Sequence, residues 1–190
     1  MITISTLTKR LLAKLNYSYF IIVLLVFSRC KDNASAITTV NDNEHTVDMS
    51  TDIPVHNFTS FEPLLYTTSN KTYIVNFWAM WCAPCVKELP YIQQYAKAYP
   101  DAEILLVSLD FQKDIDTKLK PFLQKHGITS KVVLLDDPDS NTWIDKIDPN
   151  WSGAIPFTII FNAEKRAFFE RSFESFEDLE NEVQNTIHKY

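Results

Sequence analysis

The stretch 75–90, VNFWAMWCAPCVKELP, indicates the fold, because in it an apolar strand runs into an amphipathic helix through a pair of cysteines. Residues 72–79 are apolar and rich in β-branched and aromatic side chains, which is typical of a buried strand. Residues 83–99 carry apolar side chains three or four positions apart, which is the spacing of one helix face. Cys82 and Cys85 are therefore predicted to lie at the junction of a strand and a helix.

The junction gives the two cysteines different chemistry. Unpaired N–H groups and the helix dipole stabilise an anion at a helix N-terminus, so a thiol there has a lowered pKa and attacks as the thiolate. Cys82 is therefore the expected nucleophile. Cys85 is nearly one helical turn further on, where its sulfur can attack a mixed disulfide on Cys82 and release the reduced partner. Pro84, between them, fits the first turn of a helix, where its missing N–H costs nothing.

Three other interpretations of the cysteine pair compete with redox chemistry: a zinc half-site, a buried structural disulfide and two ordinary core cysteines. A zinc site needs about four ligands, and the sequence has no second cysteine pair. A C-x-x-C pair between a strand and a helix favours redox chemistry, so we expect a redox-active pair that needs no metal and no soluble cofactor. The four histidines show no ligand-like spacing; they are His45, His56, His126 and His188.

The remainder of the chain alternates strands and helices. Ser175 is a suitable N-cap for the last helix, with Asp178 at its third position, and Gly127 supplies a C-terminal stop for an earlier one. This order predicts an α/β sheet with mixed strand directions. The expected strands are 103–109, 131–135, 156–161 and 166–170, and the expected helices are 114–126, 140–147 and 175–189.

Length and composition are those of one globular domain. The chain has 190 residues, of which 46% are hydrophobic and 22% are charged. Such a chain can build a real core and differs from a disordered or polytopic membrane protein. Its net charge is −6, and the residues after position 29 hold 14 basic against 24 acidic side chains. Repulsion from polyphosphate therefore argues against a nucleic-acid partner.

The first 29 residues differ in character from the rest. They contain four basic residues and no acid, and they include the short apolar run 19–28, YFIIVLLVFS. A basic head followed by a short apolar run is typical of an export signal. The polar stretch 30–54 then resembles a tether, which leaves 55–190 as the expected folded domain.

Cys30 lies two residues beyond the apolar run, which resembles a bacterial lipoprotein signal whose cysteine becomes the lipidated first residue after cleavage. Ser28 fits that pattern, whereas Arg29 departs from it because a small residue is expected directly before the cysteine. The alternatives are an uncleaved anchor and an ordinary signal peptide with an incidental cysteine. All three place the domain outside the cytoplasm, and the first two attach it to a membrane of the cell envelope.

Residues 55–190 resemble the thioredoxin-like proteins, specifically the TlpA-type thiol-disulfide oxidoreductases of the bacterial envelope. The resemblance rests on NFWAMWCAPCVKELP at 76–90, LLVSLDF at 105–111 and WSGAIPFTIIFN at 151–162. It implies an α/β thioredoxin fold, with a central mixed sheet flanked by helices and the extra helix–strand insertion of the TlpA-type branch. The expected partners, on the periplasmic or outer side, are cysteine-containing envelope proteins and an unidentified membrane electron donor.

The resemblance also assigns site residues. Pro156 matches a proline that follows a cis peptide bond and faces the cysteines, so the Ile155 backbone would meet a partner's extended chain. Glu88 matches a glutamate on the same helix face as the second cysteine, where it can accept or return the Cys85 proton. The alternatives are a strand-start proline and a solvated acid favoured by the helix dipole. Asn76 takes the place of a buried thioredoxin aspartate and cannot take up a proton.

An apolar patch around the first cysteine would suit docking of another protein's cysteine segment. Ile155 before the proline, the uncharged dipeptide between the cysteines and Glu88 near the second cysteine together favour a reductant. For Trp143 and Trp151, packing in the core is the favoured alternative. The expected patch and substrate-binding residues are Trp78, Trp81, Ala83, Pro84, Trp151 and Ile155.

Three rival functions remain open. A peroxiredoxin-like peroxide reductase would carry its reactive cysteine in a T-x-x-C context, which is absent here. A copper-handling Sco-like assembly factor would have a wider cysteine spacing and a distal histidine. A non-catalytic docking module would keep the fold without reducing insulin. The acidic turn with Asp136, Asp137 and Asp139 could hold a metal, but a solvated turn is favoured.

Overall fold

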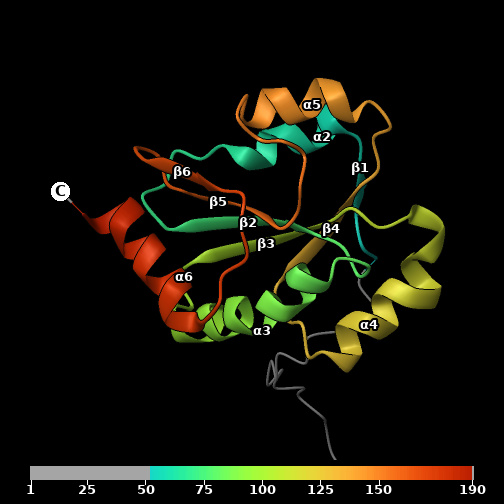
Figure 1. Ribbon diagram of the computed structural model, residues 1–190, viewed down its shortest axis with the longest axis horizontal. Coiled ribbons are helices and arrows are strands. Elements are labelled where there is room, and N and C mark those ends of the chain that lie inside the picture. Colours follow the sequence, from blue (N-terminus) through green and yellow to red (C-terminus); the bar gives the residue numbers. More distant parts are fainter. Residues whose placement is uncertain (1–51, 190) are drawn as a thin grey trace, which may run out of the picture. The chain divides into compact units, whose positions relative to one another are not determined.

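The computed structural model describes residues 52–189, which form a six-stranded mixed sheet with helices on both faces (Figure 1). The expected signal segment 1–29 lies outside these residues, as do Cys30 and nearly all of the expected tether. Within 52–189, no helix combines the length and the apolar character that a membrane span requires.

The sheet has the strand order β1-β4-β3-β2-β5-β6, with β2 among the central strands. The strands β1 to β4 are parallel to one another, whereas β5 is antiparallel to both of its neighbours, β2 and β6. This is the mixed α/β sheet that the sequence predicts. The bounds are β1 Val55–His56, β2 Tyr73–Trp78, β3 Glu103–Ser108, β4 Lys131–Leu135, β5 Phe157–Phe161 and β6 Arg166–Phe169.

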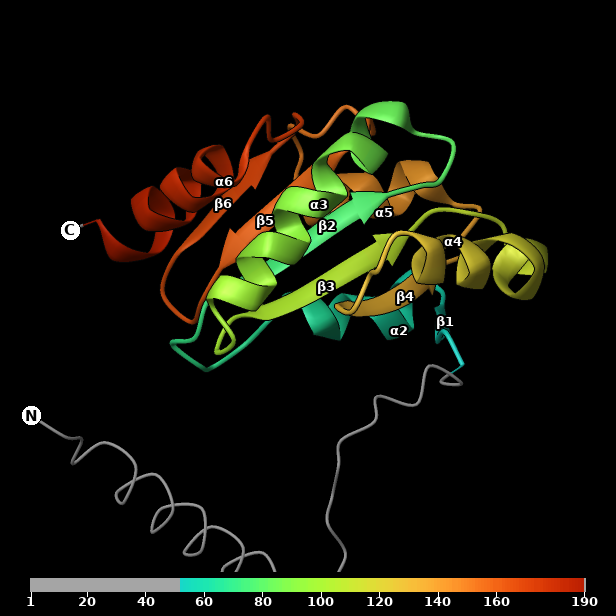
Figure 2. The same cartoon turned by 90° about the horizontal axis from the view of Figure 1, so that it is seen from below.

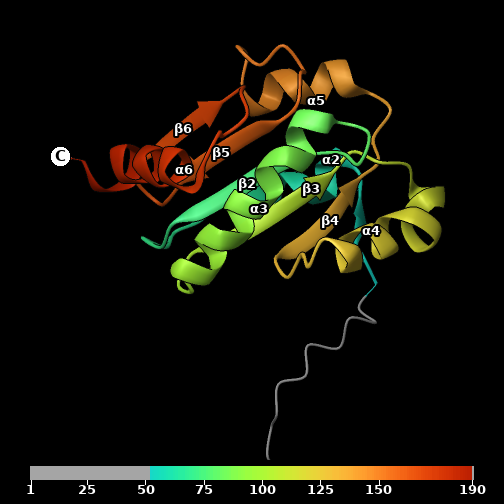
Figure 3. The ribbon, with the colours of Figure 1, turned by 60° about the horizontal axis from the view of Figure 1, so that its bottom comes forward.

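Helices cover both faces of the sheet because both faces are apolar. On one face lie α3 (Ala83–Ala98), α4 (Lys120–Lys125) and α6 (Phe176–Val183), with α3 crossing the sheet near β2 and β3 (Figures 2 and 3). On the other lie α2 (Phe58–Phe61) and α5 (Ser140–Ile147). Each face has its own hydrophobic core: the first includes Leu89, Ile92, Leu123, Leu179 and Val183, and the second includes Phe61, Phe77, Trp143, Trp151 and Phe157.

The predicted helix 114–126 is wrong in its first half. The chain instead forms a 3₁₀ turn, η2 (Gln112–Asp114), and a π-helical segment, η3 (Ile115–Leu119), before α4 begins. Pro121 lies in the first turn of α4, and a proline has no N–H to donate to the preceding turn, so regular α-helical bonding cannot run through it. The predicted last helix, 175–189, is also only partly α-helical. Its first half is α6, which continues as the π-helical segment η4 (Gln184–His188).

Two elements escape the sequence pattern. The strand β1 has two residues and α2 has four, so neither is long enough to show a hydrophobic period. The additional helix–strand unit that the resemblance implies corresponds to α4 with β4. It places β4 between β3 and β1.

The strand directions determine where the chemistry lies. Because β2, β3 and β4 are parallel, their carboxyl ends meet at one edge of the sheet, and the antiparallel β5 begins at that edge. The segments that follow these three strands and the segment that precedes β5 therefore lie next to one another.

Candidate active site

Cys82 and Cys85 form a disulfide at the start of α3, with an S–S distance of 2.00 Å and a Cα–Cα distance of 5.3 Å. Cys82 is the N-cap of the helix, and the Cys85 amide donates to its sulfur over 3.3 Å. Cys82 is 6% exposed, whereas Cys85 is fully buried. The sulfur that an incoming thiol or disulfide can reach is therefore that of Cys82.

The segment before β5 closes the site from the other side. The Ile155–Pro156 peptide bond is cis, which confirms the expectation from the resemblance. The Ile155 carbonyl oxygen lies 3.6 Å from the Cys82 sulfur. The segment directly before β5 thus lies next to the Cys82 sulfur, on the side opposite to the start of α3.

The surface around the disulfide is apolar and exposed. Trp81 is 65% exposed, and Ala83 and Pro84 are exposed beside it, with Ile155 half-buried. Trp78 does not belong to this patch, contrary to the prediction, because it is the last residue of the buried strand β2 and is fully buried. Trp151 packs in the core, with its ring stacked 4.0 Å from that of Phe157, and Trp143 is buried beside it.

Glu88 is fully buried, which contradicts the alternative of a solvated surface acid. Its Oε1 accepts a hydrogen bond from Asn76 Nδ2 over 2.7 Å, and its Oε2 accepts one from the Phe173 backbone N–H over 2.8 Å. Burial raises the pKa of Glu88 to about 7, with the two hydrogen bonds opposing the shift. Near neutral pH this carboxyl can therefore both take up and release a proton.

Asn76 connects Glu88 to the centre of the sheet. Its Nδ2 also donates to Thr158 Oγ1 over 2.9 Å, which joins β2 to β5. Its Oδ1 is buried and has no hydrogen-bond partner among the described residues. An unpaired buried acceptor costs free energy, so the amide is held in this orientation by its two donor contacts.

Asp110 is a site residue that the sequence analysis missed. It is nearly buried, and both of its carboxylate oxygens lie 3.2 Å from the Met80 backbone N–H, which donates to them. Ser108 Oγ donates to Asp110 Oδ2 over 2.8 Å. Burial raises the pKa of Asp110 above its ordinary value. The only signal was the position of this acid after a buried strand, in the stretch LLVSLDF.

The acidic turn has a structural role in this fold. Asp137 accepts hydrogen bonds from the backbone N–H groups of Phe58 and Asp139, which hold its pKa below the usual value. Among the described residues, no group of three or more His, Cys, Asp or Glu side chains is arranged to hold a metal ion.

The fold and the site define a thioredoxin-like α/β protein with a C-x-x-C disulfide at a helix start. More particularly, residues 54–166 match the model of the AhpC/TSA family, and the chain belongs to that family. Two solved structures share the fold: a DsbF homologue from Corynebacterium diphtheriae, with 21% identity over 62% of this chain and 73% of the other and a TM-score of 0.51, and a thiol:disulfide interchange protein from Chlorobium tepidum TLS, with 24% identity over 63% and 82% and a TM-score of 0.51.

Curated relatives match a shorter part of the sequence. The thiol-disulfide oxidoreductase ResA of Bacillus anthracis is 31% identical over 64 residues, which are 34% of this chain and 36% of ResA. The sporulation thiol-disulfide oxidoreductase A of Bacillus subtilis is 32% identical over 63 residues, or 32% and 38% of the two chains. The match therefore spans little more than a third of the length of these relatives.

Proposed function

We propose that this protein is a TlpA-type thiol-disulfide oxidoreductase that reduces disulfides of bacterial envelope proteins with its cysteine pair. The observation that carries the proposal is the asymmetry of the pair: the Cys82 sulfur lies at the helix cap against the Ile155 carbonyl, and Cys85 is fully buried behind it. The names of the relatives ResA and sporulation oxidoreductase A support the same chemistry.

The reaction needs no electron carrier other than the two cysteines. In the reduced protein, the Cys82 thiolate attacks one sulfur of the partner's disulfide, whose S–S bond breaks as a mixed disulfide forms and the other partner sulfur leaves as a thiolate. Cys85 then loses its proton and attacks the Cys82 sulfur, which releases the second partner thiolate. Two electrons pass to the partner, whose two sulfurs each end with a proton.

In this proposal Glu88 accepts the Cys85 proton, and Pro156 with Ile155 positions the partner's chain. A carboxyl whose pKa lies near 7 suits a proton acceptor that must also be reset. An ionised Glu88 disfavours a second anion on Cys85. In Glu88→Gln we therefore expect Cys85 to titrate at lower pH than in the wild type. Superimposable thiol titrations of the two proteins would contradict the proton-transfer role.

The direction we propose is reduction. The dipeptide between the cysteines is Ala83–Pro84, which offers no positive charge to stabilise a Cys82 thiolate, and stabilisation of the reduced form is what makes a strong oxidant. We expect a reduction potential near that of thioredoxin, about −270 mV, rather than about −120 mV. Titration against glutathione measures the potential, and a value above roughly −180 mV would contradict the proposed direction.

The site of action that we propose is the bacterial envelope. The domain would be attached to a membrane through the N-terminal segment, with lipid on Cys30, and a membrane-bound dithiol donor would return the pair to its reduced form. Mass spectrometry of the mature N-terminus tests the attachment. A mature chain that keeps residues 1–29 would replace the lipid with an uncleaved anchor.

Trapping tests the roles of the two cysteines. In Cys85→Ser the attack that resolves the mixed disulfide is lost, so we expect partner proteins to accumulate on Cys82. The matched variant Cys82→Ser lacks the accessible nucleophile and should trap none. In the reduced wild type, Cys82 should be alkylated first at mildly acidic pH. Equal trapping by the two variants would contradict the assignment.

Peroxide consumption and copper stoichiometry of the reduced protein separate the two rival activities, the peroxide reductase and the copper-handling assembly factor.

A further inference from the structure

A second exposed aromatic side chain lies on the same edge of the sheet as the disulfide. Phe111 is 63% exposed, whereas the other phenylalanines between positions 52 and 189 are buried or partly covered. It directly follows Asp110, and Trp81 directly follows Met80. Because the Asp110 carboxylate accepts from the Met80 N–H, one hydrogen-bonded anchor holds together the two segments that present these rings.

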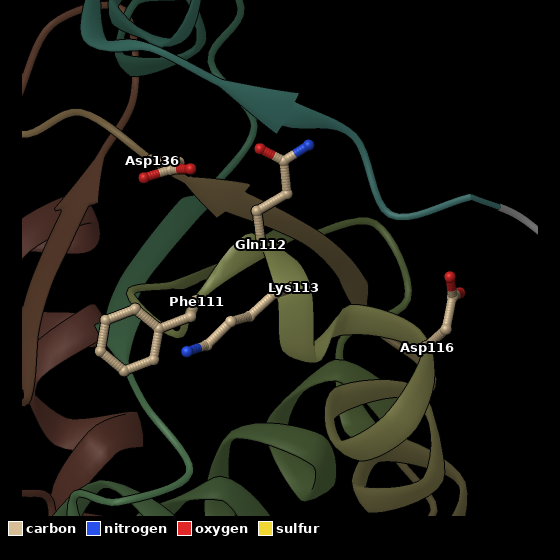
Figure 4. A pocket seen from close by; sticks show the side chains of 5 residues that line it. All are labelled: Phe111, Gln112, Lys113, Asp116 and Asp136. Atoms are coloured by element: carbon tan, nitrogen blue, oxygen red, sulfur yellow. The ribbon is translucent and has the colours of Figure 1, made fainter.

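Phe111 also borders a hollow between the ends of β3 and β4 (Figure 4). Its lining consists of Phe111, Gln112, Lys113, Asp116 and Asp136. In Figure 4 the Lys113 stem runs alongside the Phe111 ring, and the Lys113 ammonium is 5.4 Å from the ring centroid. Asp136, directly after β4, lies above Phe111 and Lys113 in this view and lines the same hollow. The hollow thus combines an exposed ring with carboxylates.

The charges of the hollow are unequally satisfied. Asp116 forms a salt bridge with Lys120 over 2.6 Å, and Lys113 lies over the ring face. Asp136 forms no salt bridge with any residue between positions 52 and 189. A carboxylate that lines the same hollow as an exposed ring is complementary to a cation carried beyond an apolar group.

We propose that Trp81, Phe111 and Asp136 form a docking surface for a cysteine-bearing protein segment that has an apolar side chain beside its cysteine and a lysine or arginine beyond it. The inference rests on the proposed function and names its substrate class. The strand order gives the order of contacts, with the partner cysteine at the end of β2, its apolar side chain over the rings and its cation at the end of β4. Because β4 is the second strand from β2, the partner chain spans two strand spacings of about 4.8 Å each, and an extended residue covers about 3.3 Å. The cation therefore lies about three residues from the cysteine.

The test uses disulfide-linked dimers of short peptides that are symmetric about the cysteine, so that chain direction does not matter. The probe is Lys-Ser-Leu-Cys-Leu-Ser-Lys, and the comparison peptides replace both leucines by glycine or both lysines by glutamate. The reduced full-length protein is mixed with each dimer, and each second-order rate constant is divided by the rate constant for dithiothreitol with the same dimer. We expect the probe to react about tenfold faster than either comparison peptide.

Variants then separate the two contacts. Phe111→Ser should abolish the preference for leucine over glycine, and Asp136→Asn should abolish the preference for lysine over glutamate while it keeps that for leucine. The control is Tyr66→Ser, which removes an equally exposed ring from the segment before β2 and should change neither ratio. Oxidised glutathione serves as a disulfide too small to reach the hollow.

The outcomes are distinct. Equal rates for the three peptides, with active reduction of all of them, would overturn the docking surface and leave the proposed function standing. An equal loss of rate on the probe and on glutathione in Phe111→Ser would show that Phe111 acts through the disulfide, which also overturns the docking surface. A protein that reduces neither peptides nor glutathione would overturn the proposed function, and the docking surface with it.

Discussion

Two buried carboxylates hydrogen-bond to the elements around the cysteine pair, and they differ in their partners. Glu88 accepts from a side chain of β2 and from the backbone before α6, so it connects α3 to both. Asp110 accepts from the Met80 N–H and from Ser108, so it connects the end of β3 to the turn before Cys82. Burial raises the pKa of both, and it brings that of Glu88 to about 7. Glu88 therefore suits proton transfer, and Asp110 suits positioning.

The raised pKa of Glu88 makes stability depend on pH. The folded state holds the Glu88 proton more tightly than the unfolded state does. The stability that this proton contributes is therefore fully present below pH 4.5 and is lost as the pH rises through about 7. Relative to Glu88→Gln, the free energy of unfolding of the wild type should fall by up to about 3 kcal/mol between pH 4.5 and pH 8. Urea denaturation of both oxidised proteins at several pH values measures this. Parallel pH profiles would contradict the prediction.

Asp110→Ala removes the anchor of the turn before Cys82. The Met80 N–H and the Ser108 hydroxyl lose a buried acceptor, so we expect the free energy of unfolding to fall by about 1–3 kcal/mol and the Met80 amide to exchange faster. The control is Asp145→Ala, since Asp145 is exposed on α5 and its loss should change stability by less than about 0.5 kcal/mol. Equal effects of the two variants would remove the positioning role.

At the level of elements, the sequence predicts what has an apolar run or a helical period. The strands from β2 to β6 and the helices α3, α5 and α6 start within a residue or two of their predicted positions, because the strands are short and mostly apolar runs, whereas the helices repeat their apolar residues every three to four positions. The two-residue β1 and the π-helical η3 cannot be predicted in this way. The first depends on pairing with a distant strand, and the second on Pro121, which interrupts the α-helical bonds of an otherwise helical pattern.

The cap of α6 provides a test at this level. Ser175 accepts a hydrogen bond from the Asp178 N–H over 3.1 Å, which confirms the predicted cap. Ser175→Ala should lower the free energy of unfolding by about 1 kcal/mol, whereas Ser175→Asp keeps an acceptor and should lower it much less. Chemical denaturation of the three proteins measures the difference. An equal loss in both variants would show that the cap contributes nothing specific.

At the level of the whole molecule, the tryptophans divide between core and surface. Trp78, Trp143 and Trp151 fill the cores, and Trp81 stands exposed beside the disulfide. The local stretch around the cysteines was sufficient to predict the pair, the helix start and the exposed Trp81. It was not sufficient to predict Asp110 or the burial of Glu88, because the strand order and the packing of α6 supply those contacts.

Two tryptophan variants should therefore separate stability from function. Trp151→Ala leaves a large cavity among stacked rings and should lower the free energy of unfolding by about 3–5 kcal/mol. Trp81→Ala should change it by less than about 0.5 kcal/mol, yet slow the reduction of peptide disulfides. Denaturation and single-turnover kinetics measure the two effects. A large loss of stability in Trp81→Ala would contradict its surface role.

The strand order has a consequence for the time course of folding. Met80 and Asp110 are 30 residues apart, whereas Asn76 and Thr158 are 82 residues apart, and contacts between distant residues pay a larger loop-closure entropy before they form. We expect β2, α3 and β3 to assemble first and β5 to join them later. Until then the cysteines lie on a helix without the segment that covers them. Pulse-labelled hydrogen exchange during refolding should show protection in β3 before β5.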